Sequence, residues 1–88
     1  MRMKRVNVAV IASIDVDGII VPHKIYWRDG REWEIKRVLH TCRSADGDFV
    51  GTRYTILIGE TERYLYRDYT IWYVLLPEEE VERCGNAG

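Results

Sequence analysis

The feature that most constrains the fold of this chain is a set of three Asp-Gly pairs: Asp17-Gly18, Asp29-Gly30 and Asp46-Gly47. Asp-Gly between segments of alternating apolar and polar residues is a strong short-range signal for a β-hairpin, because glycine adopts the positive φ of a tight turn without steric cost. The pairs therefore predict a small antiparallel all-β domain. They indicate nothing about chemistry.

The length and composition of the chain indicate one folded domain, residues 1–88. A domain of this size buries only about 60–65% of the surface of its unfolded chain, so its core is small. Hydrophobic residues make up 47% of the sequence, which excludes a disordered chain. The net charge is −1, and the mild basic bias of residues 24–43 falls short of the basic surface of a dedicated nucleic-acid-binding protein.

The N-terminal segment predicts a strand, although its first residues carry the positive charge of an export signal. Its apolar residues, Val6–Ile14, are interrupted by Asn7 and followed directly by Asp15, unlike a signal peptide. No apolar run approaches the roughly 18–20 residues that span a membrane. The two cysteines, Cys42 and Cys84, could form at most one intramolecular disulfide. We therefore expect a cytoplasmic protein with reduced thiols and no membrane association.

The segment around the second Asp-Gly pair predicts a hairpin in a definite register. With Arg28-Asp29-Gly30 as a three-residue loop and glycine in the left-handed position, one face carries apolar side chains and the other carries opposite charges. The expected pairs are Ile25 with Trp33, His23 with Ile35, Tyr26 with Glu32 and Lys24 with Glu34, with Trp27 on the face of Trp33. A shift of one residue would mix the two faces, so we expect this register.

Further strands follow from alternation and turn residues along the rest of the chain. Pro22 either ends the segment 19–21 or places it at a sheet edge, because proline cannot donate to a ladder. Val38 and Leu39 are expected to continue the second strand of the hairpin towards Cys42. The remaining strands are predicted at 53–58, 64–67 and 71–76, and Pro77 with the acidic residues after it favours a short C-terminal helix.

These segments predict an all-β fold: a small antiparallel SH3-like barrel of six to seven strands with a short C-terminal helix, or alternatively an OB-like barrel. The strand Ile71–Leu76 is apolar on both faces, unlike a half-solvated strand. Either the C-terminal helix or another chain would cover its outer face. A homodimer is thus one of two open alternatives, since exposed apolar surface often marks an interface.

The residues that could hold a metal or catalyse a reaction lack the spacing that such sites need. His23, His40, Cys42 and Cys84 are the right elements for zinc, but no pair has CxxC or HxxxH spacing. The segment 15–18 begins like a calcium loop, yet apolar residues follow where oxygen ligands should come. No catalytic motif surrounds a serine or a cysteine. We therefore expect no cofactor, no metal and no enzymatic activity.

Basic and aromatic residues lie side by side on several predicted strands, as in barrels that bind single-stranded nucleic acid. In this hypothesis Arg28, Arg31, Lys36, Arg37 and Arg53 contact phosphate, while Tyr26, Tyr64 and Tyr66 stack on bases. The competing interpretation, which we favour for the tryptophans and one tyrosine, is that large aromatics fill a small core. The residues expected there are Trp27, Trp33, Tyr54 and Trp72, whereas exposed rings are expected at Tyr26, Tyr64, Tyr66 and Tyr69.

A protein-interaction module is the alternative function. Its expected surface is the segment Tyr64–Tyr73, since aromatic grooves on small barrels also dock extended peptides. The sequence therefore predicts a non-enzymatic binding module. Nucleic acid is the sharper hypothesis for its ligand, and a protein partner is the alternative.

Four stretches carry a resemblance to a known family: Trp27–Leu39, Arg53–Ile56, Leu65–Asp68 and Trp72. They are similar to a Trp-x-Gly-Arg-x-aromatic-x-apolar hairpin and a later Leu-Tyr-x-Asp…Trp ending, which occur in small uncharacterised bacterial SH3-like β-barrel domains. This chain has an extra residue between the tryptophan and the glycine, and it lacks the family's second Trp-rich stretch. Some members accompany genes for translesion DNA polymerases, so the resemblance implies a β-barrel and a DNA-repair accessory role, without catalytic residues.

Overall fold

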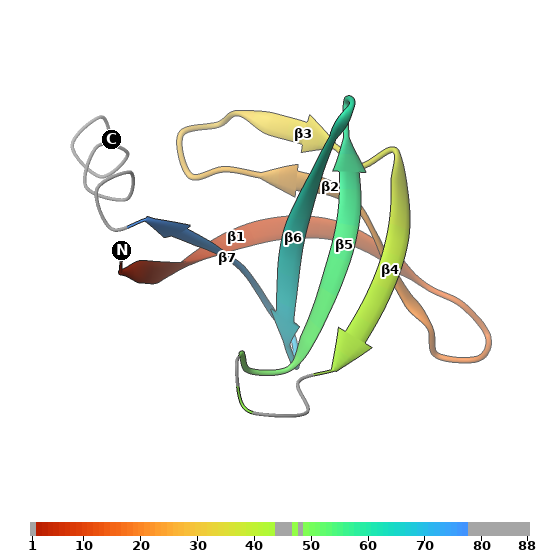
Figure 1. The fold of residues 1–88 in the computed structure, drawn as a ribbon. Coiled ribbons are helices and arrows are strands. Elements are labelled where there is room, and N and C mark those ends of the chain that lie inside the picture. Colours follow the sequence, from red (N-terminus) through yellow and green to blue (C-terminus); the bar gives the residue numbers. More distant parts are fainter. Residues whose placement is uncertain (1, 44–46, 48, 78–88) are drawn as a thin grey trace.

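The computed structural model describes residues 2–43, 47 and 49–77, and these residues form one curled antiparallel sheet (Figure 1). Its strands are β1 (Met3–Ile14), β2 (Ile20–Tyr26), β3 (Glu32–Glu34), β4 (Arg37–Arg43), β5 (Thr52–Ile58), β6 (Thr61–Asp68) and β7 (Ile71–Pro77). The prediction of an all-β fold, a small antiparallel barrel of six to seven strands, is confirmed. The expected C-terminal helix and Cys84 lie outside the described residues.

The strand order shows where the barrel closes and where it stays open. The order across the sheet is β3-β2-β1-β7-β6-β5-β4, and the pairing of β1 with β7 brings the first and last strands together. A closed ring with an odd number of strands cannot be antiparallel throughout. The break falls between β3 and β4, which follow each other in the chain and form the two edges of the sheet. The result is a half-barrel (Figure 1).

A two-residue corner connects these edges. The Ile35 N–H donates to the His23 carbonyl on β2 (2.9 Å), and the Lys36 N–H donates to the Leu57 carbonyl on β5 (2.8 Å). The expectation that Val38 and Leu39 continue the hairpin strand is therefore wrong. Residue 35 is buried in the core, and the chain bends there from one edge of the sheet to the other.

The β2–β3 hairpin has the predicted register. The observed pairs are Lys24 with Glu34, Ile25 with Trp33 and Tyr26 with Glu32, and Ile35 bonds to His23 as expected. A three-residue loop joins the strands, since the Trp27 N–H donates to the Arg31 carbonyl (2.8 Å) and Gly30 has a φ of +94°. Agreement between hydrophobic alternation and loop chemistry was thus sufficient to define this element.

Pro22 lies within β2 at a bulge. The partner of Ile11 is Lys24, whereas the partner of Ala12 is Pro22, so β2 contains one extra residue at this point. In the described residues this part of β2 pairs only with β1, which makes it an edge. Of the two alternatives for Pro22, the edge position is the correct one, and the bulge accommodates the missing N–H.

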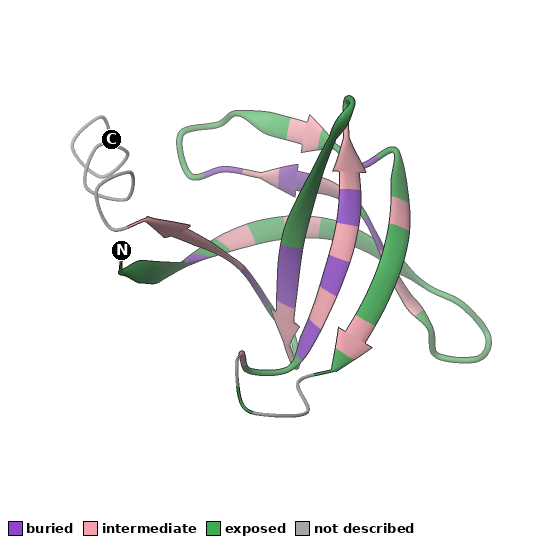
Figure 2. Ribbon diagram, in the orientation of Figure 1, coloured by how far each residue is buried: buried purple, intermediate pink, exposed green. Residues whose placement is uncertain are grey.

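The core lies inside the curl, on the inner faces of β2, β5, β6 and β7. Buried residues form stripes along the central strands (Figure 2), and the Ile56 and Leu65 side chains are fully enclosed. The buried cluster consists of Ile25, Ile35, Tyr54, Ile56, Leu65 and Trp72. Among the aromatics predicted for the core, Trp27, Tyr54 and Trp72 are buried and Trp33 packs half-buried against the cluster.

Candidate functional site

Three of the eight residues proposed to bind nucleic acid meet on the outer face of β5 and β6. Arg53 is the cross-strand partner of Tyr66, and its guanidinium lies 4.5 Å from the ring centroid of Tyr64. Tyr64 is 53% exposed, as expected, whereas Tyr66 is only 6% exposed. The prediction of an exposed ring is therefore confirmed for Tyr64 and wrong for Tyr66.

Tyr66 is buried because neighbouring rings cover it. The Tyr73 ring stacks on it with centroids 5.1 Å apart and an interplanar angle of 12°, and the Phe49 ring meets it edge-on at 5.4 Å. Burial raises the pKa of the Tyr66 hydroxyl above its ordinary value, and the positive charge of Arg53 opposes that rise. Strand alternation placed Tyr66 on the outer face, but it could not show that Phe49 folds over that face.

Val50, the residue after Phe49 in the segment before β5, covers the outer face of β7 at Tyr73. The Tyr73 hydroxyl donates to the Val50 carbonyl (2.8 Å) and accepts from the Val50 N–H (3.3 Å). On the side of β1, the Arg5 guanidinium lies 4.1 Å from the Tyr73 ring centroid. At this position the cover comes from the chain before β5 and from β1, a solution that the sequence analysis did not consider.

The other five proposed residues lie on different elements. Tyr26, Arg28 and Arg31 belong to the β2–β3 hairpin, Lys36 to the corner and Arg37 to the start of β4. Within the described part of the chain, no hydrogen bond, ion pair or ring contact joins any of them to Arg53 or Tyr64. The structure therefore does not gather the eight residues into one surface.

Arg31 is held within its own hairpin. Its Nε donates to Asp29 (2.6 Å), and its guanidinium lies 5.4 Å from the Trp33 ring centroid. The Arg31 backbone N–H also donates to Asp29, and this bond, together with the Arg31 charge, holds the pKa of the Asp29 carboxyl below its usual value. The hairpin thus neutralises one of the charges proposed to contact phosphate.

Two further expectations concern metal and thiol chemistry. Across the residues that the structure describes, no group of three or more His, Cys, Asp and Glu side chains could hold a metal ion. The His23 ring nitrogen lies 2.7 Å from the Ser13 hydroxyl, and Cys42 is a half-buried free thiol. Cys84, the one residue with which Cys42 could form an intramolecular disulfide, lies outside the described residues.

A concave feature arises where β6 and β7 diverge. Their ladder runs from Asp68↔Ile71 to Tyr66↔Tyr73 and then stops, while β6 continues to pair with β5 and β7 continues to pair with β1. The two strands meet at their turn and spread apart (Figure 1). A pocket of about 700 Å³ lies at this opening, a size typical of ligand-binding sites.

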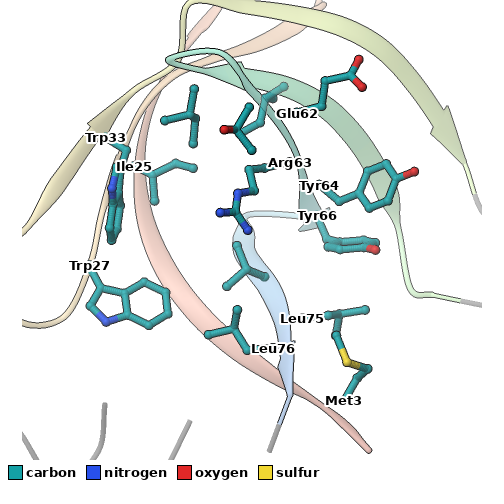
Figure 3. Close-up of a pocket in the computed structure, with 14 residues that line it drawn as sticks. Met3, Ile25, Trp27, Trp33, Glu62, Arg63, Tyr64, Tyr66, Leu75 and Leu76 are labelled. Carbon is teal, nitrogen blue, oxygen red and sulfur yellow. The ribbon is translucent and has the colours of Figure 1, made fainter. Parts of the chain in front are cut away.

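The pocket has a mostly apolar lining that comes from elements far apart in the sequence. Ile25, Trp27 and Trp33 of the β2–β3 hairpin form one side, and the Trp27 and Trp33 rings meet edge-on at 5.9 Å (Figure 3). The remaining lining residues are Met3, Ile56, Ile58, Thr61, Glu62, Arg63, Tyr64, Tyr66, Val74, Leu75 and Leu76. The aromatic hairpin and the divergent strands thus face each other across one space.

Arg63 brings a positive charge into this apolar space. Its guanidinium lies between the tryptophan side and the Tyr66 side of the pocket (Figure 3). Arg63 is exposed, and no hydrogen bond, ion pair or ring contact involves it within the described residues. The Trp27 indole N–H on the pocket wall is buried without an acceptor in this part of the chain.

The pocket was not predicted from the sequence, although the position of Arg63 in β6 offered one signal. Arg63 lies two residues before Leu65 and therefore shares the inner, core-facing side of β6. Unlike Leu65, however, Arg63 is exposed, because β7 no longer pairs with this part of β6. The rest of the lining could not be found in this way, because it depends on where the β6–β7 ladder ends.

A second exposed surface lies on the arm formed by the β1–β2 hairpin beyond Val8, where β1 no longer pairs with β7. The apolar side chains of Ile11, Ile14, Val16 and Ile19 are exposed on it. The turn of this hairpin contains Asp17-Gly18, the first of the Asp-Gly pairs, and Gly18 has a φ of +81°. Apolar exposure of this kind is typical of an interaction surface.

The comparisons with known proteins add no relative. The chain matches no family model, no curated protein and no solved structure. The resemblance to the bacterial SH3-like domains therefore stays a prediction. Among the residues described, the structure has no helix that is long and apolar enough to cross a membrane.

Proposed function

We propose that this protein is a non-enzymatic binding module that holds an extended segment of a partner protein in the pocket between β6 and β7. The observation that carries the proposal is Arg63, an exposed cation without a partner in the described residues, which lines a mostly apolar pocket. The apolar walls suit aliphatic or aromatic side chains, and the guanidinium suits a carboxylate. The ligand class is thus a peptide that combines apolar residues with an acidic one.

The position of the pocket supports this assignment over the surface expected from the sequence. The protein-interaction alternative placed the contact at Tyr64–Tyr73, but Tyr66 and Tyr73 are covered by Phe49, Val50 and each other. The part of β6 that lines the pocket together with the hairpin tryptophans runs from Thr61 to Tyr66. The proposal therefore moves the peptide site to the diverging halves of β6 and β7.

Nucleic acid is the second candidate ligand, and one observation favours it. The exposed Tyr64 ring lies beside Arg53, an arrangement that could stack a base next to a phosphate contact. Against it, Arg53 is half-buried and also packs against the Phe49 ring at 5.2 Å. A DNA-repair accessory role would follow only from this second candidate.

The test is a tryptophan-fluorescence titration, because Trp27 and Trp33 line the pocket. The probes are a terminally blocked peptide, Thr-Ile-Val-Glu-Thr-Ile-Thr, and a single-stranded DNA oligonucleotide, each at low and moderate salt. We expect saturable binding of the peptide and its loss in Arg63→Met. The matched control Arg28→Met removes an exposed arginine from the hairpin loop and should bind the peptide like the wild type.

The opposite pattern would favour nucleic acid. In that case the DNA binds, its affinity falls steeply with salt because phosphate contacts release counterions, and Arg53→Met abolishes binding. No response to the peptide, checked by calorimetry, would overturn the proposed peptide site.

A further inference from the structure

The two turns that flank β6 determine which of its backbone groups face the pocket. Both hairpins have two-residue loops, closed by the pairs Ile58↔Thr61 and Asp68↔Ile71. The closing residues of such a hairpin exchange both backbone hydrogen bonds, and bonded positions then alternate along an antiparallel strand. The residues of β6 that bond to β5 are therefore Thr61, Arg63, Leu65 and Arg67, and those that point towards β7 are Glu62, Tyr64, Tyr66 and Asp68.

Two of these residues have no strand opposite them. The ladder between β6 and β7 ends at Tyr66↔Tyr73, so the N–H and C=O groups of Glu62 and Tyr64 face the pocket without a strand partner in the described residues. The facing edge of β7 offers fewer backbone hydrogen-bond donors, because Pro77 has no N–H. An open strand edge beside an apolar pocket is the usual template for strand addition by a peptide.

We infer that the ligand binds as a β-strand on the edge of β6, bonded to Glu62 and Tyr64 and antiparallel to β6, with an acidic side chain opposite Arg63. This inference rests on the proposed function, since it assigns a conformation and a register to the peptide in the same pocket. The strand takes the place beside β6 that β7 leaves after Tyr73. The antiparallel direction follows from the greater stability of antiparallel pairing.

Strand alternation then defines the chemistry of the ligand. A residue opposite Arg63 occupies a position without direct backbone bonds, where the side chains lie closest, and it points to the inner face. A carboxylate there meets the guanidinium in the pocket (Figure 3). Residues two positions away on either side also point inwards, towards the walls that include Ile25 and Trp33, so they should be apolar. The partner sequence is thus apolar-x-acidic-x-apolar.

Amide hydrogen exchange by NMR tests the inference on the full chain with the peptide Thr-Ile-Val-Glu-Thr-Ile-Thr. In the free protein the N–H groups of Glu62 and Tyr64 should exchange faster than those of Arg63 and Leu65, which bond to β5. Saturation with the peptide should slow exchange at Glu62 and Tyr64 by at least about tenfold, because both would then be hydrogen-bonded. Arg63 and Leu65 provide the internal control.

Modified peptides separate backbone pairing from side-chain contact. N-methylation of the valine, the residue opposite Tyr64, should weaken binding by about tenfold or more because it removes a bond to β6. N-methylation of the glutamate, whose N–H points away from β6, should be tolerated. Lysine in place of the glutamate should weaken binding by at least about tenfold, because it sets two like charges opposite each other.

Two results would overturn the inference, and they are distinguishable. The first is that the peptide binds but does not slow exchange at Glu62 and Tyr64, or that the two N-methyl groups weaken binding equally. Either observation would exclude the strand on β6 and leave the proposed function intact. No binding of the peptide at all would overturn both.

Discussion

Gly51 shows how one residue without a side chain permits the chain before β5 to pack on the barrel. Its φ is +88°, and a Cβ built on it would overlap the Arg67 carbonyl oxygen. We expect Gly51→Ala to lower the free energy of unfolding by about 3 kcal/mol or more, since it adds a clash to a strained φ. Urea denaturation measures this loss.

Gly30→Ala is the matched control for this prediction. Gly30 has a φ of +94° with open space around the position of a Cβ. Gly30→Ala should therefore lower the free energy of unfolding by backbone strain alone, about 1 kcal/mol. Equal losses in the two variants would show that the contact of Gly51 with β6 is unimportant.

Tyr66 makes the stability of the fold depend on pH in the alkaline range. Its pKa is raised by burial, so the unfolded chain loses this proton at a lower pH than the folded chain. Stability is therefore retained below about pH 10, the ordinary tyrosine pKa, and falls as the pH rises through the higher pKa of the folded state. We expect Tyr66→Phe to show a shallower decline in the free energy of unfolding between about pH 9 and pH 11. An unchanged decline in denaturation measurements would contradict the burial of this hydroxyl.

Arg63 and Leu65 lie on the same face of β6 but have different roles. Leu65 is fully buried, so Leu65→Ala should cost about 2–5 kcal/mol of unfolding free energy. Arg63 has no partner in the described residues, so Arg63→Met should change stability by less than about 0.5 kcal/mol while it abolishes peptide binding. A large destabilisation by Arg63→Met would indicate a structural role for this arginine.

At the level of elements, the hairpins were predictable because their information is local. In the β2–β3 hairpin, alternation, charge pairing and the glycine of the loop all favour the register that the structure shows. The corner at Ile35-Lys36 was not predictable, because the local pattern runs on as one strand. Only the distant carbonyls of His23 and Leu57 show where the chain leaves one edge for the other.

The candidate site was predictable only in part for the same reason. Sequence reasoning named Arg53 and Tyr64 as candidate ligand-binding residues without pairing them, and the structure brings them into contact. The pocket, however, depends on the end of the β6–β7 ladder at Tyr66↔Tyr73. No residue near this point marks the end of the ladder, since both strands continue with ordinary strand-forming residues.

The homodimer prediction concerned the strand Ile71–Leu76, and the β1–β2 arm offers a second copy a different exposed surface. Ile14, Val16 and Ile19 are exposed on it, and a second copy would remove this apolar surface from water. We expect sedimentation equilibrium of the wild type to show a mass above one chain at high concentration, and Val16→Asp to shift the population towards the monomer. A wild type that stays monomeric at every concentration would exclude the dimer.

Over the residues that the structure describes, the molecule is a half-barrel that closes through β1 and β7 and opens in two places. One opening lies between β3 and β4, where the corner connects the sheet edges. The other lies between β6 and β7, where the pocket contains Arg63. A partner strand on β6 would fill the second opening, and this links the architecture to the proposed function.

The central claim is that Arg63 selects an acidic peptide, and a charge exchange tests it most directly. Calorimetry would compare Thr-Ile-Val-Glu-Thr-Ile-Thr with its lysine counterpart on the wild type and on Arg63→Glu. The account predicts that the wild type prefers the glutamate peptide by at least about tenfold and that Arg63→Glu reverses the preference. Equal affinity for the two peptides on the wild type, or the same preference in both proteins, would contradict it.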